Sequence, residues 1–212
     1  MKTIIFDWAG VISNSFETNS ILVNAVFEKF GAKRMSLKEI RDSWEMPYMK
    51  FYNKFLPNLT IEEETEAFSE FFKNSQKANI YPGVKDILEK FYDNKINMFV
   101  VTGDLDISFR EDMDRYGLGN IFTKIYTNIH DKTKIIGQII DENKLDVNNT
   151  YTIADTTHEM EIGKIYNIKT VAITWGFQSR EKLKLSNPDY LVDNFEEFEN
   201  IILNNNPARR DK

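Results

Sequence analysis

The sequence contains no cysteine, which excludes disulfide bonds and thiolate metal sites from the chain. It has no run approaching the ~18 consecutive apolar residues that a membrane-spanning helix needs. The N-terminus enters an apolar strand-like run directly, without the pattern of a signal peptide. Basic residues are in deficit, and the net charge of −6 disfavours nonspecific nucleic-acid binding. We therefore expect a soluble, cytoplasmic protein, a monomer or homodimer, that binds neither nucleic acid nor membrane.

Hydrophobic residues make up 42% of the 212 residues, enough for a sizeable core. Short runs rich in β-branched residues alternate with segments of helical periodicity. The runs span residues 2–6, 96–101, 124–127, 150–154, 168–173 and 189–192, and the helical segments span 84–91, 107–116, 134–143 and 159–166. This alternation predicts an α/β fold, with a parallel sheet that helices cover on both faces.

The region between the first two strands breaks this alternation. Residues 15–80 show no convincing strand, and their periodicity predicts helices at 18–30, 37–43, 47–55 and 61–75. The segment "IYPGV" then returns the chain to the α/β pattern. We expect an α/β core of residues 1–14 and 81–204, an all-helical insertion at 15–80, and a disordered Asn-rich tail at 205–212.

Polar residues follow four of the predicted strands. Asp7, Thr102 and Asp155 come directly after strands, and Lys132 opens a helix after another strand. Because open parallel sheets bind ligands beyond the carboxyl ends of their strands, these residues are candidates for one site. Carboxylates suit Mg²⁺, and an ammonium and a hydroxyl suit phosphate oxygens. Each residue taken singly also fits a helix-capping role.

These segments together resemble the haloacid dehalogenase superfamily. "IIFDWAG", "VVTGD", a lysine before a helix, and "ADTTHEM" resemble its four motifs in order, and the helical insertion lies where that family has a cap domain. The resemblance implies a Rossmann-like core and Mg²⁺-dependent hydrolysis of a small phosphorylated or phosphonylated metabolite. A phosphoacceptor receiver domain also uses Asp, Thr, Lys and Mg²⁺, but its motif order differs and it has no such insertion.

The resemblance also assigns roles to residues of this chain. Asp7 would be the nucleophile that forms an aspartyl-phosphate, and Thr102 and Lys132 would hold the phosphate oxygens. Mg²⁺ would be bound by the Asp7 carboxylate, the Ala9 carbonyl and Asp155. The further candidates are Glu159, acting on the metal site from behind its ligands, and Gly10, Gly103, Met46 and Lys134, binding substrate or phosphate. Lys134 is also the rival of Lys132 for the lysine role.

Ala9 departs from the pattern of most phosphatases in this superfamily. They place there an Asp that protonates the leaving oxygen and activates water. One interpretation is a branch that cleaves C–P bonds: "DWAG" and "MPYMK" resemble motifs of phosphonoacetaldehyde hydrolase, with Lys50 as the imine-forming lysine. Asn53, Asp104 and Lys132 depart from that branch, where it has His, Tyr and Arg.

Two alternatives to C–P cleavage stay open. "WEMPYMKFY" also resembles the specificity loop of phosphoglycolate-phosphatase-like members, in which Lys50 would contact an anionic substrate. The acid–base role would then fall to water, Glu17 or Asp104. Alternatively, the chain has lost catalysis and binds phosphate and Mg²⁺ as a regulatory protein. A helix from Pro47 would place Tyr48, Phe51, Tyr52 and Phe55 in the core of the insertion, with Lys50 facing away.

Overall fold

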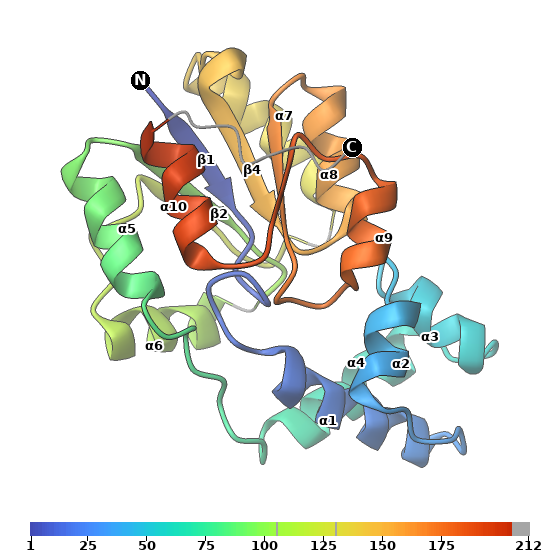
Figure 1. Ribbon diagram of the computed structural model, residues 1–212. Coiled ribbons are helices and arrows are strands. Elements are labelled where there is room, and N and C mark those ends of the chain that lie inside the picture. The colour runs from blue at the N-terminus through green and yellow to red at the C-terminus, as the bar shows by residue number, and fades with distance from the viewer. Residues whose placement is uncertain (105, 130, 205–212) are drawn as a thin grey trace.

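The computed structural model describes residues 1–104, 106–129 and 131–204 (Figure 1). The C-terminal tail that we predicted to be disordered lies outside these residues. A parallel six-stranded sheet has the order β3-β2-β1-β4-β5-β6. The strands are β1 (Thr3–Phe6), β2 (Asn97–Val101), β3 (Lys124–Tyr126), β4 (Thr150–Ala154), β5 (Lys169–Ile173) and β6 (Tyr190–Val192). The predicted α/β fold is therefore confirmed.

Ten α-helices lie in the described part of the chain. They are α1 (Phe16–Lys29), α2 (Leu37–Ser43), α3 (Met49–Phe55), α4 (Ile61–Phe72), α5 (Val84–Asp93), α6 (Asp106–Tyr116), α7 (Lys132–Glu142), α8 (Thr157–Ile165), α9 (Arg180–Leu185) and α10 (Phe195–Asn204), with a 3₁₀ turn at Val147–Asn149. Helices α9 and α10 were not predicted. No helix among the described residues has the length and apolar character needed to cross a membrane.

Alternating side chains of the strands build one apolar layer on each face of the sheet. Ile4 and Phe6 of β1 pack into a cluster with residues of α5, α6 and α10, whereas Ile5 packs on the opposite face with α7 and α8. Both layers are buried, which explains why the strands read as continuous apolar runs. Covered on both faces, the sheet leaves only its ends for a site.

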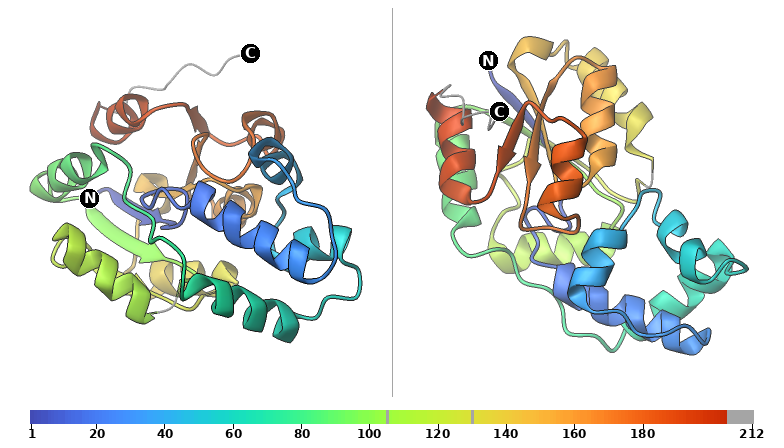
Figure 2. Two further views of the ribbon diagram at one scale, coloured as in Figure 1. Left: turned by 90° about the horizontal axis from the view of Figure 1, so that it is seen from below. Right: turned by 45° about the vertical axis from the view of Figure 1, so that its right-hand side comes forward.

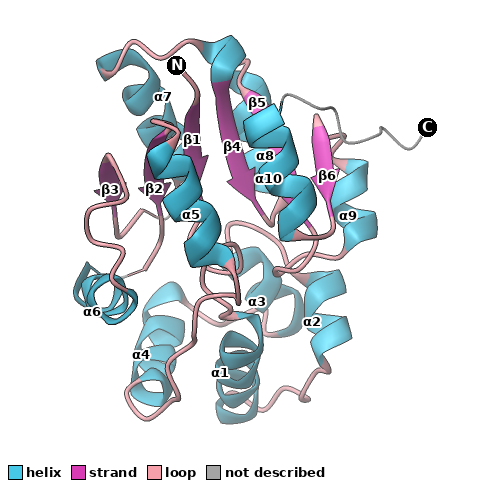
Figure 3. Cartoon of the chain, turned by 60° about the vertical axis from the view of Figure 1, so that its left-hand side comes forward, coloured by secondary structure: helices cyan, strands magenta, loops and turns pink. Residues whose placement is uncertain are grey.

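Helices α1–α4 form a group of their own, below the end of the sheet toward which β1 and β4 point (Figures 2 and 3). Their apolar core includes Phe27, Phe51 and Tyr52, each at most 1% exposed. Phe177, from the loop after β5, packs into this same core. Of the aromatic residues predicted for this core, Phe51 and Tyr52 are buried in it, whereas Phe55 is 38% exposed. We keep residues 15–80 as a proposed cap.

The start of α3 corrects one prediction. Pro47 does not open the helix, which begins at Met49 after a short bend. The chain before it is held by tertiary contacts that the periodicity does not reveal, because the Trp44 carbonyl accepts hydrogen bonds from Gln178 (3.0 Å) and Lys182. The proposed cap and the loop after β5 are therefore joined by polar contacts as well as by the Phe177 ring.

Candidate active site

Strand order places Asp7 and Asp155 at the centre of the sheet. The chain runs from β1 to β2 on one side and reaches β4 on the other, so β1 and β4 border a topological switch point. Phe6 is in register with Ile153, and the Asp7 amide donates to the Ile153 carbonyl at 3.0 Å. Asp155 follows directly after β4. The two carboxylates therefore emerge from neighbouring strand ends.

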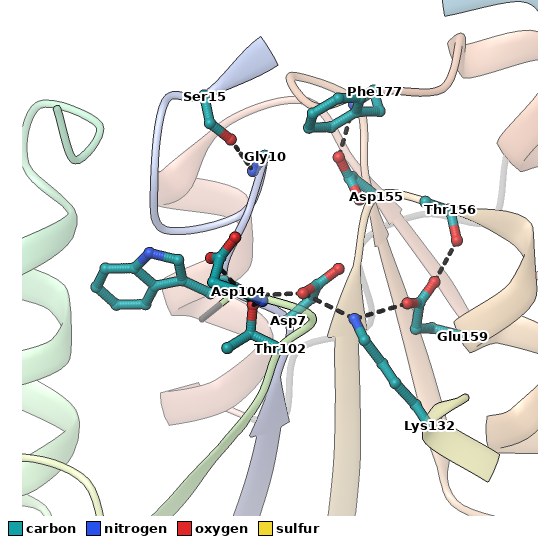
Figure 4. Close-up of polar contacts among 11 residues, drawn as sticks. Asp7, Gly10, Ser15, Thr102, Asp104, Lys132, Asp155, Thr156, Glu159 and Phe177 are labelled. Atoms are coloured by element: carbon teal, nitrogen blue, oxygen red, sulfur yellow. Dashed lines mark hydrogen bonds and ion pairs between the residues drawn. The ribbon is translucent and has the colours of Figure 1, made fainter. Parts of the chain in front are cut away.

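Lys132 links Asp7 to Glu159 (Figure 4). Its Nζ lies 2.7 Å from Asp7 Oδ1 and 2.8 Å from Glu159 Oε1, and its side chain is only 7% exposed. Thr156 donates a short hydrogen bond to the other Glu159 oxygen, and the Trp8 amide donates to Asp7 Oδ1 at 2.6 Å. Both oxygens of Glu159 are thus engaged, and Glu159 holds Lys132 beside Asp7; its predicted role behind the metal ligands stays a prediction.

Burial and charge shift the pKa values of this group in opposite directions. Burial raises the pKa of Asp7 to about 6, although the positive charge of Lys132 opposes the rise. Burial, and then the negative charge of Asp7, also raise the pKa of Asp155. Burial would lower the pKa of Lys132, but Asp7 and Glu159 outweigh it and raise that pKa. Lys132 therefore remains charged, whereas burial disfavours the ionised forms of Asp7 and Asp155.

Asp155 lies in a tight space between two glycines. Its Oδ2 accepts a hydrogen bond from the Phe177 amide at 2.6 Å. A Cβ added to Gly10 or to Gly176 would lie 2.1 Å from this same oxygen, which no side chain tolerates. Gly10 also has φ +75°, a conformation that favours glycine. The loops after β1 and β5 therefore need glycine to reach the Asp155 carboxylate.

The donor set fits a magnesium ion. No three His, Cys, Asp or Glu side chains in the described ranges form a metal-binding group, so a cation here would have two carboxylates and backbone or water oxygens. Mg²⁺ is commonly held by one or two carboxylates and keeps several waters. The buried Asp7 and Asp155 repel each other, and a cation would relieve that repulsion.

Of the other predicted residues, Thr102 and Gly103 lie at the end of β2, whereas Lys134, Met46 and Lys50 make no recorded contact with Asp7 in the described part of the chain. Thr102 is 1% exposed at the end of β2, next to the half-buried Gly103, and its hydroxyl contacts Asp104 rather than solvent. Lys134 is exposed on α7, so the structure brings Lys132 and not Lys134 to Asp7. Met46 and Lys50 lie in the proposed cap, where Lys50 is exposed. Within the described ranges, no recorded hydrogen bond or ion pair joins Met46, Lys50 or Lys134 to Asp7.

Sequence reasoning missed the loop after β5. Gly176 and Phe177 hold Asp155, and Gln178 accepts from the Thr157 amide at 2.7 Å while donating to the cap. The sequence contains a pattern that could have identified this loop, because "TWGFQ" follows a predicted strand at the same end of the sheet as Asp7. A glycine directly after a strand also indicates a close approach of backbone to another group.

Gly176→Ala is expected to displace Asp155. The new methyl group would lie 2.1 Å from Asp155 Oδ2 and 2.5 Å from its Cγ, so the carboxylate or the loop must move. We expect a loss of about 1–3 kcal/mol in unfolding free energy, as for overpacking, and a larger relative loss of any Asp155-dependent activity. Thermal or urea unfolding measures the first effect.

Gly119→Ala is the matched control, because nothing lies within 4 Å of its added Cβ. That variant should stay within about 0.5 kcal/mol of the parent protein. Equal stability of the two variants would contradict the packing described for Asp155.

Comparison with known proteins agrees with this architecture. The model of the haloacid dehalogenase-like hydrolase family matches residues 4–173. A phosphoglycolate phosphatase from Vibrio parahaemolyticus is 19% identical, with 95% of this chain and 96% of that protein covered. A pyrophosphatase PpaX from Oceanobacillus iheyensis is 23% identical, with 95% and 97% covered.

Solved structures show the same fold. A haloacid dehalogenase-like hydrolase from Streptococcus pneumoniae matches with a TM-score of 0.77 at 21% identity, over 93% of this chain and 96% of that one. A predicted phosphatase from Clostridium acetobutylicum also has a TM-score of 0.77, at 19% identity, over 95% and 98%. The family model spans most of the chain, including β1, β2 and β4. The chain therefore belongs to the haloacid dehalogenase-like hydrolase family.

Proposed function

We propose that the protein is a Mg²⁺-dependent phosphohydrolase that attacks small phosphate monoesters with Asp7 and forms an aspartyl-phosphate. The observation that supports this most is the contact of Lys132 with Asp7 at 2.7 Å, at the switch point of the sheet and beside a second buried carboxylate. A lysine in that place offsets charge on the nucleophile and on an incoming phosphoryl group. Relatives named as phosphoglycolate phosphatase support the monoester class.

Asp7, Asp155 and the Ala9 carbonyl would hold the magnesium ion in this proposal. When bound, the ion would neutralise charge on the phosphoryl oxygens and bring the substrate next to Asp7. Lys132 keeps the Asp7 carboxylate ionised and oriented, and Glu159 and Thr156 hold Lys132 in place. Thr102, buried at the end of β2, donates its hydroxyl to Asp104 and would turn it to a phosphate oxygen when substrate binds.

Cleavage of a C–P bond is the second candidate, because Ala9 and the "DWAG" motif favour it. That chemistry needs Lys50 as an imine-forming amine with a lowered pKa, which burial under a closed cap would provide. Lys50 is exposed on α3, so the structure favours phosphate esters over phosphonates. The non-catalytic alternative is weakened by the complete Asp7–Lys132–Glu159 arrangement. A cytoplasmic location and the oligomeric state remain predictions.

A substrate panel tests the proposal. With Mg²⁺, we expect phosphate release from small esters such as phosphoglycolate, and none after chelation of the metal. Phosphonoacetaldehyde should release no phosphate, and borohydride should trap no adduct on Lys50. Cleavage of the phosphonate with an adduct on Lys50 would establish the second candidate instead. Binding of phosphate and Mg²⁺ without any turnover would show that the protein is not catalytic.

A further inference from the structure

Hydrolysis through Asp7 lacks an acid and base at the usual place. Ala9 offers only a methyl group, and its backbone pairs with Ser13 in an isolated bridge. A leaving alkoxide needs a proton, and the water that attacks the aspartyl-phosphate must lose one. Positioned acid–base groups contribute about 10²–10⁴-fold to such steps. Another carboxyl group near Asp7 would therefore have a defined task.

Asp104 lies beside the threonine proposed to bind phosphate. It follows Thr102 in the loop after β2, where Thr102 Oγ1 donates to Asp104 Oδ2 at 3.1 Å and accepts from the Asp104 amide at 3.2 Å. This double contact fixes the carboxyl group beside the hydroxyl proposed to hold phosphate. Lys132, which contacts Asp7, also exerts its charge on Asp104. Figure 4 draws Asp104 and Thr102 together, on the side of Asp7 opposite Lys132.

Asp104 also borders open space. It lines a cleft between the core and α1, together with Ser13, Ser15, Thr18, Lys77 and Asp112. Asp7, Thr102, Lys132 and Asp155 are not among its lining residues, so the cleft adjoins the site through Trp8, which follows Asp7, and through the half-buried Asp104. Burial raises the pKa of Asp104, which favours a carboxyl group able to hold a proton. The hydrogen bond from Thr102 and then the charge of Lys132 oppose this rise in pKa, and Asp112 adds to it.

The remaining carboxyl groups are less suitable. Asp112, the second acid of the cleft, is paired with Arg115 at 2.7 Å. Glu17, the other candidate from the sequence, is exposed in the first turn of α1. Glu159 has both oxygens engaged by Lys132 and Thr156. Asp104 therefore lines the cleft and also contacts the threonine that we propose binds phosphate.

We propose that Asp104 is the general acid and base of this enzyme, in the role that Ala9 leaves open; this inference rests on the proposed function. As Asp7 forms its bond to phosphorus and the bond to the leaving oxygen breaks, the Asp104 proton passes to that oxygen. Water then attacks phosphorus, Asp104 takes one water proton, and the bond from Asp7 to phosphorus breaks. Phosphate leaves, and both aspartates return to their starting states.

Asp104→Asn tests the role, because the amide oxygen can still accept from Thr102. With an alkyl ester such as phosphoglycolate, we expect a loss of about 10²–10⁴-fold in kcat. With 4-nitrophenyl phosphate, whose leaving group needs no proton, the variant should release one rapid equivalent of nitrophenol and then stall, because dephosphorylation still lacks its base. A merely structural role would lower both rates alike and give no burst.

Two further variants sharpen this result. Asp112→Asn, in the same cleft, should stay within a few-fold of the parent protein on both esters. Ala9→Asp, combined with Asp104→Asn, should restore part of the lost turnover by supplying an acid at the usual place. Turnover of the alkyl ester by Asp104→Asn within a few-fold of the parent, or equal losses without a burst, would overturn the proposal.

The parent protein separates this inference from the proposed function. If the parent protein hydrolyses no ester, the proposed function and the role of Asp104 both fail. If the parent protein hydrolyses esters and Asp104→Asn does so at the same rate, only the role of Asp104 fails. If Asp104→Asn does not fold, a measurement on the parent protein alone can still contradict the role of a general acid. Its rate of phosphoenzyme formation should depend weakly on the leaving-group pKa when an acid protonates that group, and a steep dependence would contradict the role.

Discussion

Asp7→Asn is expected to abolish turnover while leaving the protein folded. The amide is a poor nucleophile, and loss of a covalent nucleophile costs on the order of 10⁵-fold or more in kcat. The fold should survive because Lys132 keeps Glu159 as its partner at 2.8 Å. Burial already raises the pKa of Asp7 to about 6, so its ionised form destabilises the folded protein at neutral pH. Phosphate release and thermal unfolding measure the two effects.

Asp7→Glu is the companion variant. It keeps the charge next to Lys132 but moves the carboxylate by one methylene away from the position set by the Trp8 amide and Lys132. We expect activity to fall nearly as far as in Asp7→Asn, because attack on phosphorus depends on geometry. Phosphate release by Asp7→Asn at the rate of the parent protein would remove Asp7 as the nucleophile.

Lys132→Met is expected to lower both the stability and the activity of the protein. The substitution keeps a long apolar stem but leaves Asp7 and Glu159 buried without their shared cation. Removing one partner of a buried ion pair costs about 3–5 kcal/mol. Loss of an electrostatic contact to the reacting group should lower kcat by about 10²–10³-fold. Urea unfolding without Mg²⁺ measures the stability change.

The stability loss of Lys132→Met should grow with pH. Lys132 lowers the pKa of Asp7, so without it the folded-state pKa rises further above about 6. A carboxyl group with a raised folded-state pKa binds its proton more tightly in the folded protein, so stability falls as pH rises through that range. The gap between parent and variant should therefore be smaller at pH 5 than at pH 8. A gap that is constant with pH would contradict the electrostatic cause.

Lys134→Met is the control for this experiment. Lys134 lies on the same helix but is exposed, and it was the rival candidate from the sequence. Substituting an exposed residue of this kind should change stability by less than about 0.5 kcal/mol. If Lys134→Met lost activity and Lys132→Met kept it, the lysine role would have to move two positions along α7.

Much of the fold was predictable because its signals are local. All six strands lie within one residue of their predicted ends, since buried parallel strands read as short apolar runs. Helix α2 has its predicted bounds, and Ser36 and Glu39 form a capping box at its start. The bend before α3 and the short helix α9 depend on tertiary contacts, such as those of the Trp44 carbonyl, that leave no periodic pattern.

The site shows the same division. The closeness of Asp7 and Asp155 was predictable because each follows a strand, and the sheet brings strand ends together. Sequence alone did not reveal that Glu159 holds Lys132, nor that Gly176 and Phe177 enclose Asp155. It also left Glu17 and Asp104 equivalent, whereas the contact of Asp104 with Thr102 distinguishes them. These relations join residues far apart in the chain, so spacing does not encode them.

Mass spectrometry of protein quenched in acid during turnover tests the attack by Asp7 most directly. The parent protein, with Mg²⁺ and a phosphate ester that it hydrolyses, should carry one phosphoryl group on the peptide that contains Asp7, and Asp7→Asn should carry none. Steady release of phosphate with no phosphoryl group on Asp7, or with the group on another residue, would contradict the mechanism.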